Sequence, residues 1–96
     1  MKASGPRHIE NSLNAALQNL GLSVKLRRFQ VIEMWSSIVG EQIAHVTTAE
    51  RMDGDKLIVH VSRAPWRNEL MFLKKELIAK INSAMNQEIV KDIIFR

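Results

Sequence analysis

Cationic side chains stand beside an aromatic residue at one point of this 96-residue chain. Arg63 and Arg67 lie on either side of Trp66, where alternating apolar residues give way to apolar residues at helical spacing. Guanidinium groups bind phosphates and carboxylates through paired hydrogen bonds, and an indole ring supplies a large apolar contact area. This junction is therefore the first candidate for a binding surface.

Further cations extend the candidate surface along the chain. Lys74 is seven residues after Arg67, so both lie on one face of the helix predicted there, and Lys75 follows. Another basic cluster occurs earlier, between residues 25 and 28. We predict that seven cations contact nucleic-acid phosphates: Lys25, Arg27, Arg28, Arg63, Arg67, Lys74 and Lys75.

Both tryptophans fall within apolar stripes. Trp35 and Trp66 repeat with the neighbouring apolar residues at helical spacing, which favours burial in the core over stacking on bases. We therefore expect nucleic acid to be bound through its phosphates rather than through its base edges.

Charge is distributed unevenly along the chain, whose net charge is +4. Residues 1–28 carry a net charge of +4, residues 29–55 carry −4, and residues 56–96 carry +4. Such asymmetry is typical of a protein that attracts a polyanion with one face and a basic partner with another. The alternative is a set of surface charges that only keep the chain soluble.

The sequence has few residues that could perform catalysis. It has no cysteine, and its three histidines (His8, His45 and His60) lack the i, i+4 spacing of a helical zinc site. The glycines are isolated, so no phosphate-binding loop and no G-x-x-G nucleic-acid clamp occurs. We predict a protein that is not an enzyme and that uses no metal, no cofactor and no small-molecule substrate. His45 is interpreted as structural and His60 as solvent-exposed.

Composition favours a soluble domain of the cytoplasm. Apolar residues make up 46% and charged residues 25% of the chain. The longest unbroken apolar run, residues 70–73, is far too short to span a membrane, and the first residues have no apolar signal segment. We predict a cytoplasmic location without membrane contact.

Hydrophobic periodicity and turn residues predict the order α-α-β-β-α-β, which is the α+β class. The predicted elements are a helix at 9–20 ended by Gly21, a helix from about 26 or 28 to 39 ended by Gly40, a possible helical turn at 41–44, a hairpin of 46–52 and 56–62, a helix at 65–85 and a strand at 89–95. The last strand follows a helical crossover, so it is expected to pair parallel with one hairpin strand. We predict a three-stranded mixed sheet packed against helices in a KH-like arrangement, with residues 1–8 as a flexible arm and 9–96 as one domain.

Five segments, taken in order, resemble one family. They are Trp35 to His45, Gly54 to Val61, Trp66 to Leu70, Ile81-Asn82 and Ile93 to Arg96. Together they are similar to the DciA family of bacterial proteins. This resemblance implies a KH-like domain that interacts with the DnaB-type replicative helicase, assists its loading on DNA and has some DNA affinity of its own.

The sequence leaves three hypotheses for the function. The first is a DNA-replication accessory protein with the helicase and DNA as partners. The alternatives are a KH-like RNA-binding module and a protein-interaction domain without a nucleic-acid role. For the helicase contact, the acidic segment, the second predicted helix and the hairpin are open alternatives.

Overall fold

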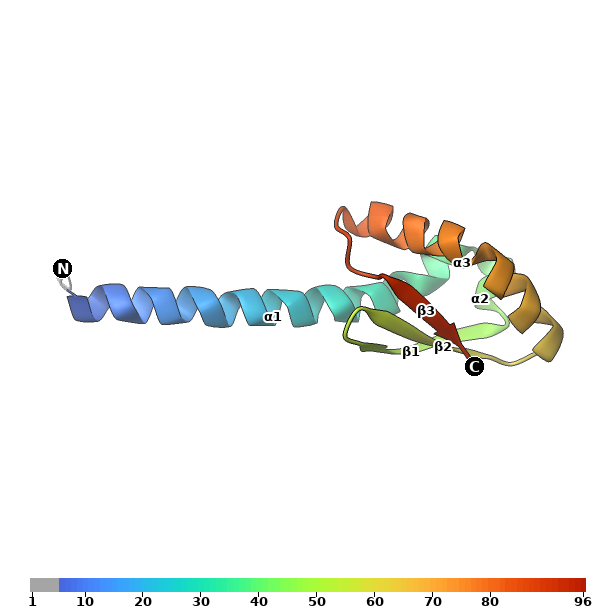
Figure 1. Cartoon of the computed structure of the whole chain (residues 1–96), viewed down its shortest axis with the longest axis horizontal. Helices are drawn as coiled ribbons and strands as arrows, with labels where there is room; N and C mark the ends of the chain where they lie inside the picture. The colour runs from blue at the N-terminus through green and yellow to red at the C-terminus, as the bar shows by residue number, and fades with distance from the viewer. Residues whose placement is uncertain (1–5) are drawn as a thin grey trace.

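The elements follow the predicted order. The computed structural model describes the backbone of residues 6–96 and the side chains of residues 21–96. The elements are α1 (Pro6–Val39), α2 (Glu41–Ala44), β1 (Thr47–Asp53), β2 (Lys56–Val61), α3 (Ala64–Met85) and β3 (Asp92–Phe95), as Figure 1 shows. The α+β class is confirmed. Residues 1–5 of the predicted arm lie outside the described part, and residues 6–8 belong to α1.

The first helix is longer than predicted, and the break at Gly21 was wrong. Helix α1 continues through this glycine without a break and has 34 residues in all. A glycine inside a helix costs only about 1 kcal/mol relative to alanine, and the leucines on both sides of Gly21 favour the helix. Gly40 does end α1, because its φ of +90° is a conformation that other residues rarely adopt.

The three strands form one mixed sheet in the order β1-β2-β3. β1 and β2 make the predicted antiparallel hairpin, with Gly54 at φ +63° in the turn. The register shifts between Ala49 and Arg51, so Glu50 forms a bulge that bends the edge strand. β3 returns after α3 and pairs parallel with β2, which confirms the predicted crossover.

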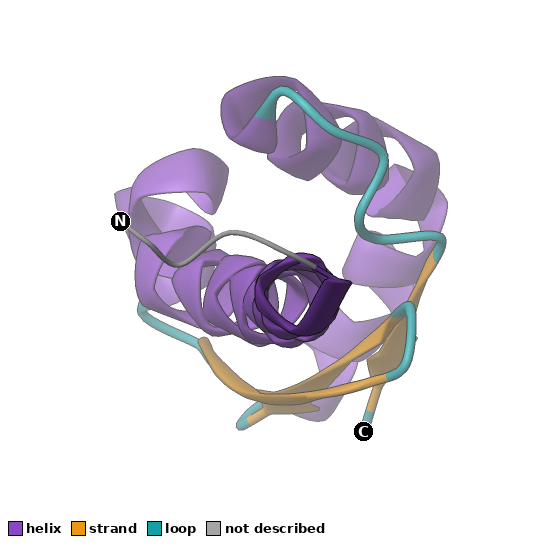
Figure 2. Cartoon of the chain, turned by 90° about the vertical axis from the view of Figure 1, so that its left-hand side faces the viewer, coloured by secondary structure: helices purple, strands orange, loops and turns teal. Residues whose placement is uncertain are grey.

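Helices cover one face of the sheet. Figure 2 shows α1 and α3 on the same side of the sheet. Alternate residues of β2 point into the core between them: Leu57, Val59 and Val61. The helices contribute a buried stripe at helical spacing, formed by Val31, Trp35, Leu70, Leu77, Ile81 and Met85. This one-sided layer is compatible with a KH-like arrangement.

A buried hydrogen-bonded chain joins three elements at one end of the core. The Trp35 side chain is 1% exposed, and its Nε1–H donates to Thr47 Oγ1 at 2.9 Å. The Thr47 hydroxyl in turn donates to the Ile43 carbonyl at 2.7 Å. The chain therefore ties α1 to β1 and to α2 without leaving the indole N–H unpaired.

Asn82 holds the loop between α3 and β3. Its Oδ1 accepts hydrogen bonds from the backbone N–H groups of Ile89 and Val90, and its Nδ2 donates to the Val90 carbonyl. One side chain thus satisfies three backbone groups of the loop. The contact fixes where β3 starts, and it gives a physical role to the Ile81-Asn82 segment.

Replacing Thr47 tests the buried chain. Thr47→Val keeps the side-chain shape but leaves the Trp35 N–H and the Ile43 carbonyl without their partner. We expect a loss of about 1–3 kcal/mol in the free energy of unfolding, measured by urea denaturation. Thr48→Val makes the same chemical change at the exposed neighbouring position. Equal stabilities for the two variants would contradict the structural role of the Thr47 hydroxyl.

Candidate functional site

The first basic cluster lies on α1, and one of its three side chains is bonded to another part of the fold. Lys25 is exposed and Arg28 is half-buried. Arg27 donates through Nη1 to the carbonyl of Met85, at the last residue of α3, at 2.9 Å. A cation at this position satisfies a helix-terminal carbonyl and offsets the negative end of the helix dipole. Arg27 therefore has a structural role that the sequence did not reveal.

The second basic cluster belongs to α3 and the residue before it. Arg63 is the N-cap residue and is exposed, and Lys75 is exposed farther along the helix. Arg67 is half-buried, and its Nε is buried without a hydrogen-bond partner among the described residues. Lys74 forms an ion pair with Asp92, with 3.2 Å between Nζ and Oδ1.

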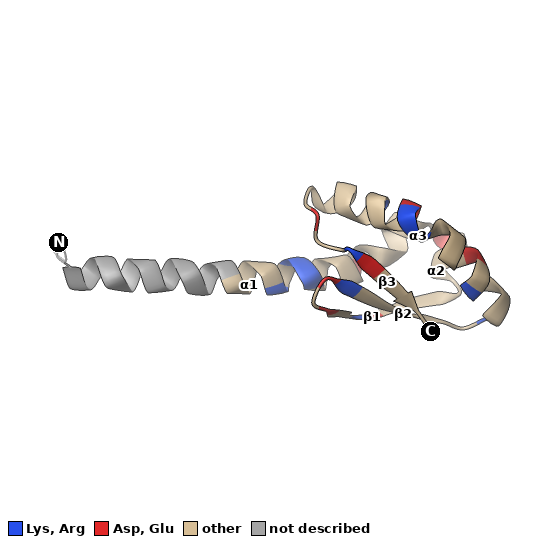
Figure 3. Ribbon diagram, viewed as in Figure 1, with Lys and Arg blue, Asp and Glu red and all other residues tan. Residues whose placement is uncertain are grey.

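The two clusters do not form one patch. Arg27 contacts the last residue of α3, whereas Arg67 lies in the first turn, 18 residues earlier. At a rise of 1.5 Å per residue these positions are about 27 Å apart. Figure 3 shows basic residues on α1 and, separately, along α3. The seven candidate cations therefore divide into a group on α1 beside the C-terminal end of α3 and a group that extends from the N-terminal end of α3 to Lys74 and Lys75 in its middle.

Asp92 is held in its charged form. Partial burial raises the pKa of this carboxyl, but the hydrogen bonds from Lys74 and from the Ile93 N–H, together with the positive charges of Lys74 and Lys56, outweigh that effect. The pKa of Asp92 consequently lies below its ordinary value of 3.8. Lys74 is therefore engaged at neutral pH, and a phosphate would have to compete with Asp92 for it.

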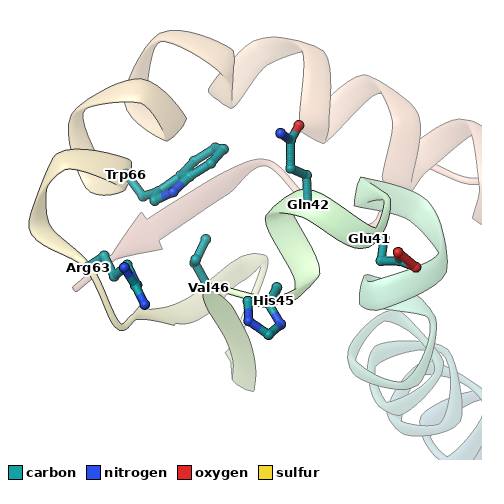
Figure 4. Close-up of a pocket in the computed structure, with 6 residues that line it drawn as sticks. All are labelled: Glu41, Gln42, His45, Val46, Arg63 and Trp66. Atoms are coloured by element: carbon teal, nitrogen blue, oxygen red, sulfur yellow. The ribbon is translucent and has the colours of Figure 1, made fainter.

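An open cleft lies between α2 and the start of α3. Its volume is about 660 Å³, and it is lined by Glu41, Gln42, His45, Val46, Arg63 and Trp66. Figure 4 shows Arg63 beside the beginning of α3 and Glu41 at the opposite side, on α2, with Trp66 and Gln42 between them. The cleft thus combines an indole, an amide and charges of both signs.

Local backbone structure positions the two walls of the cleft. Arg63 is extended (φ −130°, ψ 121°), and its carbonyl accepts a hydrogen bond from the Trp66 N–H at 3.1 Å. Pro65 fits in the first turn, where an N–H has no helical partner. Ser62 joins the walls, because both its N–H and its hydroxyl donate to the Val46 carbonyl.

Two sequence interpretations change at this cleft. Trp66 was expected to be core, but its half-buried side chain contacts the core and also lines the cleft. His45 was expected to be structural, but it is exposed and lines the cleft too. Contacts across about 20 residues of sequence leave no local signal. The one sequence feature that could have indicated the cleft is segment 41–44, in which polar residues directly follow the turn at Gly40.

Several large apolar side chains are exposed in the described part of the chain. Leu22, Leu26 and Phe29 follow one face of α1 at 55–58% exposure, and Phe72 on α3 is 88% exposed. Figure 1 shows that α1 extends well beyond the sheet, in a molecule 63 Å long and about 20 Å wide. Exposed apolar surface of this kind is a common mark of interaction sites.

The described residues contain neither a metal-binding cluster nor a helix that could span a membrane. No group of three or more His, Asp or Glu side chains within them is arranged to hold a metal ion. Neither of the two long helices, over the part that the structure describes, has the continuous apolar length that crossing a bilayer requires.

The fold defines a small α+β domain with a three-stranded mixed sheet, and comparison with known proteins assigns its family. The family model described as "Dna[CI] antecedent, DciA" matches residues 8–95, so the chain belongs to the DciA family. It is 25% identical over 88 residues to the UPF0232 protein Rv0004 of Mycobacterium tuberculosis, covering 92% of this chain and 47% of that protein. It is 31% identical over 81 residues to a UPF0232 protein of Rhodococcus jostii, covering 83% and 43%. The chain spans less than half the length of these relatives.

The Asp92–Lys74 pair predicts a pH-dependent contribution to stability. Because the folded-state pKa of Asp92 is lowered, its stabilising effect is present above the ordinary pKa and is lost as the pH falls through the folded-state value. Asp92→Asn should lower the free energy of unfolding at pH 7 by less than about 1 kcal/mol, because the pair is partly exposed. The difference should disappear at an acidic pH well below the ordinary pKa of 3.8, where the carboxyl is protonated in the folded and the unfolded state.

Asp53→Asn is the matched control for this measurement. Asp53 is exposed and makes no ion pair within the described residues, so its replacement should leave stability nearly unchanged at both pH values. A difference between wild type and Asp92→Asn that does not change with pH would contradict the role of the carboxylate charge.

Proposed function

We propose that this chain is a DNA-replication accessory protein that binds the DnaB-type replicative helicase and assists its loading on DNA. It acts in the cytoplasm by binding rather than by catalysis, and it contacts DNA weakly through phosphates. The observation that carries this proposal is membership of the DciA family across residues 8–95. Helicase interaction and DNA affinity are what the resemblance to this family implies.

The distribution of polar side chains supports a binding role. Glu41 and His45 both line the cleft, but no hydrogen bond or ion pair joins their side chains within the described residues, and Glu50 and His60 lie outside it, so no acid–base pair is formed there. The cleft offers a tryptophan and an arginine, and α1 and α3 carry exposed apolar residues. Tryptophan and arginine are among the types that contribute most to protein interfaces.

The surface around Phe29 supports contact with single-stranded DNA. The Phe29 ring is 58% exposed, Lys25 lies one helical turn before it, and Arg28 is its neighbour. Stacking of bases on an exposed ring, with cations for the phosphates, is how many proteins hold single strands without sequence preference. Bases of a closed duplex are not available for such stacking. We therefore assign the DNA contact of this domain to single strands and to the segment of α1 from Lys25 to Phe29.

Helicase binding tests the main proposal. The purified domain should retain the replicative helicase of the same organism in a pull-down, and the complex should weaken but persist at high salt, because salt screens charge pairs and leaves apolar contacts. Absence of binding at both low and high salt would contradict the helicase role. In that case the RNA-binding and scaffold alternatives would take its place.

Substitution of Phe29 tests the DNA contact. Phe29→Ala should weaken binding of a fluorescent single-stranded oligonucleotide by about 1–3 kcal/mol and should change duplex binding little. If about four phosphates are contacted, the slope of log affinity against log salt for single strands should be about −3. Both quantities can be measured by fluorescence anisotropy.

Phe72→Ala is the matched control for this substitution. The Phe72 ring is more exposed than that of Phe29, but the charged residues one turn from it on α3 are Glu69, Glu76 and Lys75, which are negative on balance, whereas those one turn from Phe29 are Lys25 and Glu33, which balance. Carboxylates repel phosphates, so this variant should bind single strands as the wild type does. An equal loss in both variants, or no loss in Phe29→Ala, would contradict the assignment to Phe29.

A further inference from the structure

The cleft between α2 and α3 has the composition of a recognition site. Trp66 places its ring between the core and the cleft, Val46 adds an apolar surface, and Gln42 offers both a donor and an acceptor. Its volume of about 660 Å³ lies within the range of natural ligand pockets. The cleft therefore has room for a short chain segment rather than for a whole helix face.

The walls of the cleft are fixed before anything binds. Ser62 ties the end of β2 to Val46 by two hydrogen bonds, and α2 is held through the contact of Ile43 with Thr47. The Trp66 backbone is fixed by its hydrogen bond to Arg63. Such preorganisation lowers the entropy lost when a partner is bound.

Charges of opposite sign at the two sides indicate the class of ligand. Arg63 stands on the α3 side, and Glu41 stands at the outer rim on the α2 side with its carboxylate directed outward. A nucleic-acid strand carries a negative charge at each phosphate and would be repelled by Glu41. A polypeptide can carry an acidic residue for Arg63, an apolar side chain for Trp66 and a basic residue for Glu41. The amide of Gln42 can also hydrogen-bond to a peptide backbone.

We infer that this cleft binds a short segment of the helicase that carries an acidic residue, an apolar residue and a basic residue in that spatial order. The inference rests on the proposed helicase role and locates the contact. It also means that Arg63 recognises a carboxylate of the partner protein. Its guanidinium group can do so through two parallel hydrogen bonds.

Exchange of the two charges separates site-specific recognition from a general effect of net charge. Three variants are required: Arg63→Glu, Glu41→Lys and the double variant that carries both changes. Each single variant should weaken helicase binding by about tenfold, measured by biolayer interferometry with the purified helicase. The double variant, whose net charge equals that of the wild type, should also be weakened. If binding instead follows net charge, the two single variants will shift in opposite directions and the double variant will match the wild type, which would overturn the inference.

Control variants make the same charge changes away from the cleft. Arg51→Glu on β1 and Glu88→Lys in the loop before β3 alter exposed residues and should bind as the wild type does. Circular dichroism and thermal melting should show that all variants fold. Gln42→Ala, an uncharged change of an exposed side chain, should weaken binding several-fold if the cleft is occupied.

The wild-type measurement separates failure of the helicase role from failure of the inference. Wild-type binding that persists in all cleft variants would leave the helicase role intact and overturn the assignment to this cleft. No wild-type binding would refute both. Loss of single-stranded DNA binding in Arg63→Glu, with helicase binding unchanged, would make the cleft a nucleic-acid site and would also overturn the inference.

Discussion

The buried indole of Trp35 is the contact on which the rest of the arrangement depends. Its ring fills the core between α1 and the sheet, and its N–H leads through Thr47 to the Ile43 carbonyl. The segment between Gly40 and Thr47 is thereby tied to α1 through Ile43 and Thr47. This segment forms the α2 side of the cleft. A buried polar chain of this kind specifies one geometry, because any other packing would leave an N–H or a carbonyl unpaired at a cost of about 1–3 kcal/mol.

The two ends of α3 explain why arginines of this chain have different roles. At the C-terminal end, Arg27 is half-buried and donates to the Met85 carbonyl, so its charge is used within the fold. At the N-terminal end, Arg63 is the N-cap residue, makes no side-chain cap hydrogen bond and is exposed. A cation is not favoured there by the positive end of the helix dipole, so its position is not explained by helix stability. Availability to a partner therefore distinguishes Arg63 from Arg27, although the sequence predicts both as equal parts of a basic surface.

Much of the fold followed from patterns that are local in sequence. Alternating residues around Gly54 predicted the hairpin, helical spacing from Trp66 to Met85 predicted α3, and the crossover rule predicted the parallel pairing of β3. Gly21 was misread because the same residue type ends a helix at Gly40 and is tolerated within one at small cost. The cleft and the pairing of Lys74 with Asp92 arise from residues that are distant in sequence, so no local pattern could reveal them.

The separation of the two proposed binding surfaces has a consequence for how the domain would act. Phe29 lies two residues from Arg27, which contacts the last residue of α3, whereas the cleft begins at the first turn of that helix. With both bound as proposed, about 27 Å of helix would separate a single strand of DNA from the helicase segment. A domain that holds both raises the effective concentration of DNA near the helicase, and each contact can then be weak. Weak individual contacts release readily, as loading of a helicase onto DNA requires. The rigid length of α3 would therefore set the distance between the two partners.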